Sequence, residues 1–106
     1  ELLDAAKKML EWMLENPEYI TAEVNLLNKL QIALRERKLT FNEKSELYTI
    51  IANTSDEFIK IGAFLLLDEQ DEAKLMLHAL EPKKLERFKE FPIYRFYNEV
   101  EEETNG

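Results

Sequence analysis

The chain contains 106 residues with a formal net charge of −8 at neutral pH, and 45% of them are hydrophobic and 34% charged. This balance predicts one folded domain with its own core. The net charge of −8 disfavours nucleic acids and anionic membranes as partners, because a negative surface repels both. The absence of cysteine excludes disulfides and thiol chemistry, and no apolar run is long enough to predict a transmembrane helix or a signal peptide.

Composition also predicts the fold class. Glycine and proline occur only two and three times, whereas the strong helix formers Leu, Glu, Lys and Ala are abundant. We therefore expect an all-α fold in a single domain that covers residues 1–106. A chain without cysteines or a membrane segment is expected to be cytoplasmic. Because the chain starts with Glu1 instead of methionine, we also expect it to be part of a longer protein.

Hydrophobic periodicity divides the chain into helices. The first covers residues 2–15 and ends before Pro17, since proline disfavours helical geometry in the residue that precedes it. The second covers residues 19–38, and its broad arc of apolar positions indicates a helix covered on two sides. Further helices are predicted at residues 41–52, 56–67, 72–81, 83–90 and 93–102.

Two capping boxes mark predicted helix starts. Thr40 precedes Glu43 by three residues, and Thr54 precedes Glu57 by the same interval. In this motif the threonine and the glutamate each accept a hydrogen bond from a free backbone N–H group at the helix start. Both motifs therefore predict well-defined N-termini for the helices that follow.

Two similar segments lie far apart in the chain. Ala5 and Ala73 are 68 residues apart, which is twice the roughly 34-residue period of tetratricopeptide repeats. The first helix resembles the second half of one such repeat through Ala5, Met9 and Pro17. Residues 58–80 resemble a whole repeat, in which small residues lie where helices cross and large neighbours fill the space around them. This second resemblance depends on Phe58, Ile61, Gly62, Leu65, Ala73, Leu77 and Leu80.

The resemblance implies a stack of antiparallel helical hairpins, an α-α superhelix, closed by a C-terminal capping helix. It also implies a non-catalytic module that binds a peptide or a partner helix in a groove lined by the second and fourth helices. Six residues are expected to line this groove: Asn25, Asn28 and Gln31 on the second helix, and Ile59, Ala63 and Leu66 on the fourth. The amide side chains can hold a peptide backbone, because each both donates and accepts hydrogen bonds. The apolar residues need cover from the C-terminal segment or from a partner subunit.

Two alternative functions remain open. The first is homodimerisation through the unpaired face of the first helix, with Leu3, Leu10, Trp12 and Leu14 as contacts. The second is a regulatory helical segment of a larger enzyme or transcription regulator. The first follows from the missing first half of the N-terminal repeat, which leaves one side of that helix without a neighbour. The second follows from the expectation that the chain is part of a longer protein.

Catalytic and cofactor sites are not expected. His78 is the only histidine, and acid–base or metal chemistry needs convergent groups. The acidic residues 68–72 lack the glycine and the alternating ligands of a calcium loop. Aromatic residues concentrate between Phe88 and Tyr97, where we expect a helix that closes the last repeat. A protein-docking surface is the alternative for this segment, whereas flanking glutamates disfavour base stacking.

Overall fold

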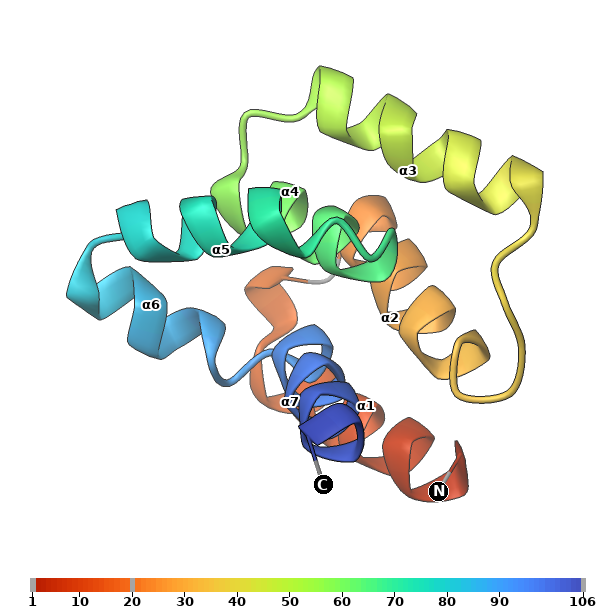
Figure 1. The fold of residues 1–106 in the computed structure, drawn as a ribbon. Helices are drawn as coiled ribbons and strands as arrows, with labels where there is room; N and C mark the ends of the chain where they lie inside the picture. The colour runs from red at the N-terminus through yellow and green to blue at the C-terminus, as the bar shows by residue number, and fades with distance from the viewer. Residues whose placement is uncertain (1, 20, 106) are drawn as a thin grey trace.

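The structure is a computed structural model that describes residues 2–19 and 21–105, and the side chains of residues 3–19 and 21–98. Within these residues every regular element is helical, which confirms the predicted all-α class. The elements shown in Figure 1 are α1 (Leu2–Glu15), the 3-10 turn η1 (Pro17–Tyr19), α2 (Ala22–Ala33), α3 (Phe41–Asn53), α4 (Glu57–Leu66), α5 (Gln70–Ala79), α6 (Pro82–Phe88) and α7 (Pro92–Asn105).

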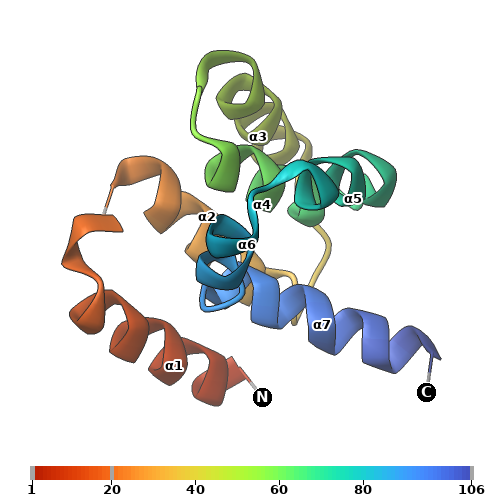
Figure 2. The same ribbon diagram turned by 90° about the vertical axis from the view of Figure 1, so that its left-hand side faces the viewer.

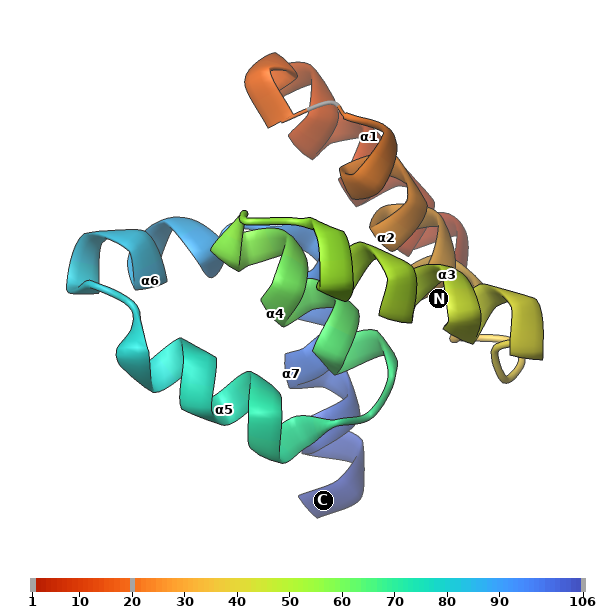
Figure 3. The ribbon, with the colours of Figure 1, turned by 90° about the horizontal axis from the view of Figure 1, so that it is seen from above.

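Helix α4 is the centre of the molecule. It packs against α2, α3, α5 and α7, and the view from above in Figure 3 shows α3, α5 and α7 around it. Its sequence is apolar on almost every side, as expected of a helix that neighbours cover all round. Six of its residues are buried: Ile59, Ile61, Gly62, Ala63, Leu65 and Leu66.

The first and last helices, α1 and α7, pack on the same side of this centre. Helix α1 contacts α2 and α7, and α7 also contacts α2 and α4 (Figure 2). The aromatic segment before and within α7 supplies much of the core, since Phe88, Phe91, Ile93 and Phe96 are all buried. The segment therefore belongs to the core between α1, α2 and α4, and the expectation that it closes a last repeat stays a prediction. Its buried rings are not available as a docking or base-stacking surface.

One of the two predicted capping boxes is confirmed. The Thr40 hydroxyl accepts a hydrogen bond from the Glu43 N–H at 3.2 Å, and the Glu43 carboxylate accepts one from the Thr40 N–H at 2.8 Å. The box predicted at Thr54 is wrong, because Asp56 caps α4 instead. The Asp56 carboxylate accepts bonds from the N–H groups of Phe58 and Ile59, at 2.8 and 3.2 Å.

The second predicted helix is too long. It was expected over residues 19–38, but α2 ends at Ala33 and a loop covers residues 34–40, while residue 20 lies outside the described residues. The loop turns because Leu39 is buried in the core, only 8% exposed. Arg37 holds the loop against α3 through two 2.8 Å bonds to the Glu43 carboxylate.

Helix pairing only partly follows the tetratricopeptide pattern. Helices α4 and α5 pack closely, as expected for the hairpin predicted at residues 58–80. The pair α2 and α3 departs from it, because both helices pack mainly against α4 instead of against each other. The regular stack of hairpins therefore stays a prediction, while the all-α class is established.

Candidate partner-binding groove

The six residues predicted to line a groove lie mostly in the core. Only Asn25 is exposed. The prediction of an open groove between the second and fourth helices is wrong for this structure, because α2 and α4 pack directly against each other. The buried members are Asn28, Gln31, Ile59, Ala63 and Leu66, each at most 8% exposed.

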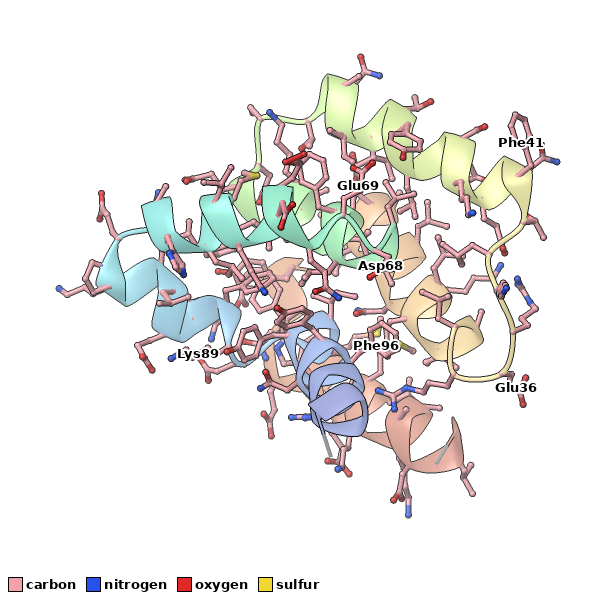
Figure 4. The ribbon with its side chains drawn as sticks, in the orientation of Figure 1. Glu36, Phe41, Asp68, Glu69, Lys89 and Phe96 are labelled. Carbon is pink, nitrogen blue, oxygen red and sulfur yellow. The ribbon has the colours of Figure 1, made fainter. Side chains whose placement is uncertain are left out.

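The side-chain amides of Gln31 and Asn28 lie inside the molecule, away from any partner surface. The Gln31 side-chain oxygen accepts bonds from Nε and Nη2 of Arg35, both at 3.3 Å. The guanidinium of Arg35, in the loop after α2, lies over the ring of Phe96, 5.4 Å from its centre, so it links the end of α2 to α7. Figure 4 labels Phe96 on α7. The Asn28 side-chain nitrogen has no hydrogen-bond acceptor among the described residues. Neither amide is presented to a partner.

The predicted dimer face needs one correction. Trp12 is only 6% exposed, and its ring packs against Phe91 and Tyr19 with centroid distances of 4.9 and 6.0 Å. It therefore belongs to the core, because it lies on the side of α1 that faces the rest of the chain. The other three residues of that face, Leu3, Leu10 and Leu14, are exposed.

An open groove does exist, but between α2 and α3. Its volume is about 630 Å³, within the range of about 300–1,000 Å³ that ligand sites occupy. Its residues are Ala22, Glu23 and Leu26 of α2, and Asn42, Ser45, Glu46, Thr49 and Ile50 of α3. We call this feature the α2–α3 groove.

Local sequence features position both walls of the groove. Thr21 caps α2 by accepting a bond from the Val24 N–H at 3.2 Å, which starts the helix so that Ala22 and Leu26 share one side. On α3, the capping box and Arg37 fix the helix start. The remaining groove residues of α3 recur at intervals of three and four, which places them along one face.

The opposite side of α3 attaches the helix to the core. Leu47 is completely buried. The Tyr48 hydroxyl donates a 2.8 Å hydrogen bond to the carboxylate of Glu69, which lies in the turn between α4 and α5 (Figure 4). This bond raises the pKa of Tyr48, because the charged acceptor favours the protonated phenol. Since α3 is anchored through this side, its groove face stays open.

The groove combines an apolar surface with acidic edges. Leu26 and Ile50 are half-buried and lie against the core. Glu23 and Glu46 are exposed, and the groove contains no lysine or arginine. Carboxylates on both walls give the opening a negative potential that favours a basic ligand.

Sequence reasoning missed this groove, although α2 carried a signal. Its broad apolar arc predicted cover on two sides, and Leu26 lies on the second of them. Leu30, on that same arc, is buried, whereas Leu26 faces the groove. A hydrophobic pattern shows that a face needs cover, but it does not show which neighbour supplies it.

Other candidate sites are less suited to binding. His78 is exposed on α5, and no group of three metal-binding side chains occurs in the described part of the chain. The acidic turn has a structural explanation. Asp68 has a positive φ of 60°, and the Glu69 N–H bonds to the Phe64 carbonyl at 3.0 Å. With the Asp68 N–H bonded to the Leu65 carbonyl, this is a Schellman ending of α4.

Comparison of the chain with protein-family models, with curated proteins and with solved structures finds no match. The resemblance to tetratricopeptide repeats therefore stays a prediction made from the residues. In the described residues, no helix has the length and apolar character needed to cross a membrane.

Proposed function

We propose that the chain is a non-catalytic protein-interaction module whose α2–α3 groove binds an amphipathic helix of a partner protein. The groove itself is the observation that supports this function, because it is open, mainly apolar and flanked by two helices. A helix laid between two others is a common way to bury an apolar face. A cytoplasmic location, which the cysteine-free sequence suits, is part of this proposal.

The residues of the groove favour a helix that approaches closely. Ala22, Ser45 and Thr49 are small, so the backbone of a third helix can come near both walls. Leu26 and Ile50 then supply the apolar contact for one or two large side chains of the partner. Helices of this kind present such side chains at intervals of three, four and seven residues.

The charges of the groove favour a basic partner. Glu23 and Glu46 stand on opposite walls, and the whole chain carries a net charge of −8. A helix with leucines on one side and lysines or arginines flanking them matches this pattern. Charge complementarity of this type raises the association rate and excludes acidic competitors.

The test uses two synthetic helical peptides with the same leucine positions, one flanked by lysines and the other by glutamates. Titration into isotopically labelled protein is followed by NMR chemical shifts. We expect the lysine peptide to perturb the backbone signals of groove residues such as Leu26 and Thr49, and the glutamate peptide to leave them unchanged. Perturbations that spread evenly over the acidic surface, or none at all, would contradict the proposal.

Matched charge reversals sharpen this test. Glu46→Lys removes one acidic edge of the groove and is expected to weaken binding of the lysine peptide by about tenfold at low salt. Glu36→Lys makes the same change in net charge on the loop after α2, outside the groove (Figure 4). Both residues are exposed, so both variants should fold. Equal losses in the two variants would show attraction by net charge alone.

A further inference from the structure

Three leucines of α1 are exposed along one line. Leu3, Leu10 and Leu14 are 77%, 56% and 83% exposed. Intervals of seven and four residues place them on the same side of the helix. They make up half of the large hydrophobic side chains that are exposed in the described part of the chain. We call them the leucine stripe.

The leucine stripe points away from the rest of the molecule. The opposite side of α1 carries the buried residues Ala5 and Trp12 and packs against α2 and α7. Figure 2 shows α1 along the outer edge of the molecule. Because the chain already covers one side of α1, only another molecule or segment can cover the leucine stripe.

We propose that the leucine stripe binds the leucine stripe of a second copy of the chain, with the two α1 helices antiparallel. Leu3 of one copy then faces Leu14 of the other, and the two Leu10 side chains lie near the centre. An interface of this kind is isologous, since both copies contribute the same residues.

The charges beside the leucine stripe specify the antiparallel direction. Lys7 and Glu11 are exposed on the same flank, and Lys7 precedes Glu11 by one helical turn. In the antiparallel pair, Lys7 of each copy lies opposite Glu11 of the other, which gives two ion pairs. A parallel pair would place this flank of the two copies on opposite sides of the interface, so neither ion pair could form. The order of these two charges therefore makes the face complementary to itself.

One helix face is a small interface compared with those of permanent dimers. We therefore expect a weak dimer that dissociates on dilution. Sedimentation equilibrium should show an average mass that rises with concentration from 12.6 kDa towards twice that value. A mass that remains at 12.6 kDa up to millimolar concentration would overturn the proposal.

Two matched leucine substitutions locate the interface. Leu10→Glu is expected to raise the dissociation constant at least tenfold, whereas Leu75→Glu should leave it unchanged. Leu75 is a suitable control, because it is 71% exposed on α5. Circular dichroism should show the same helix content in both variants. If Leu75→Glu weakens the dimer as much as Leu10→Glu, the leucine stripe is not the interface and the proposal fails.

The absence of cysteine allows a direct test of direction. Leu3→Cys and Leu14→Cys proteins are mixed and oxidised under mild conditions. The antiparallel pair predicts a mixed disulfide in clear excess over either symmetric one. An excess of the symmetric disulfides would show a parallel pair and overturn the proposed arrangement. Neither position lines the α2–α3 groove, so either result leaves the proposed binding function unaffected.

Discussion

Arg87 shows how a single side chain joins distant parts of the sequence. Its guanidinium donates hydrogen bonds to Asn16 and to the Tyr19 hydroxyl, and it forms an ion pair with Glu18 at 3.3 Å. The same group lies 4.9 Å from the centre of the Tyr19 ring. Asn16 in turn donates a 2.9 Å bond to the Trp12 carbonyl. Arg87 on α6 therefore fixes the bend between α1 and α2.

Replacing Arg87 with alanine is expected to lower the free energy of unfolding by about 1–3 kcal/mol, since it removes charge-assisted bonds and a cation–π contact. Arg87→Lys should recover only part of this loss, because an ammonium cannot form the planar fork of bonds. Urea unfolding measures both changes. The control Lys89→Ala removes one exposed ion pair to Glu86 and should cost less than 1 kcal/mol. Equal effects of the two alanine variants would contradict this role for Arg87.

For individual residues, the sequence predicted the chemical role of a side chain better than its position in the fold. Asn28 and Gln31 were predicted as hydrogen-bonding amides that line an open groove, and the structure buries both. Trp12 was assigned to an outer face but packs against Phe91, a residue far away in the chain. Periodicity places residues on the same side of a helix. It does not tell which side a distant segment covers.

The start of α3 depends on Glu43. Its carboxylate accepts bonds from Arg37 and from the Thr40 N–H, and these bonds, that of Arg37 above all, lower its pKa from an ordinary 4.5 to about 2. A lower pKa in the folded state means that Glu43 stabilises the fold above pH 4.5. This contribution disappears as the pH falls from about 4.5 to about 2.

The charge of Glu43 is therefore expected to contribute to acid unfolding. Glu43→Gln can keep the capping bond to Thr40, but it removes the charge. Its melting temperature should fall less than that of the original chain between pH 5 and pH 2, about the range in which the group titrates. Calorimetry at a series of pH values measures this difference. The control Glu86→Gln makes the same chemical change on α6. If the melting temperature of the Glu43→Gln variant fell with pH as steeply as that of the original chain, the prediction would be contradicted.

Helices were easier to predict than their ends. Capping residues and prolines close to a boundary give local signals, and α1 begins and ends where periodicity placed it. The end of α2 has no such signal, since Leu34 to Lys38 can continue a helix. Burial of Leu39 and the bonds between Arg37 and Glu43 stop it, and both depend on contacts outside the helix.

How the helices pack in the whole molecule was harder to predict from the sequence than the helices themselves. Its radius of gyration, 13.0 Å, is that of one compact domain of this length. Small residues correctly marked places of close packing, since Gly62 and Ala73 are both buried. The neighbours of Gly62 are Leu27 and Ile93, however, which belong to α2 and α7. The α2–α3 groove was not predicted, because it depends on how two helices diverge after both have packed on α4.

Gly62 is the point at which α2, α4 and α7 meet. A Cβ atom there would lie 3.0 Å from Cδ1 of Leu27 and 3.6 Å from Cγ2 of Ile93. Gly62→Ala should change stability little, because a gain in helix propensity of about 1 kcal/mol offsets the displacement of the flexible Leu27 side chain. In Gly62→Val the gain in helix propensity does not offset the steric cost, since the added methyl groups reach further towards neighbours that are already packed.

We expect Gly62→Val to lower the free energy of unfolding by about 2–3 kcal/mol in urea titrations. Ala52→Val, a small-to-β-branched change on an exposed position of α3, should cost only about 0.5 kcal/mol. Combining Gly62→Val with Leu27→Ala should give a smaller loss than the sum of the two single changes, because the truncated leucine leaves room for valine. Strict additivity would show that Gly62 and Leu27 do not compete for the same space, and the helix junction would then need another explanation.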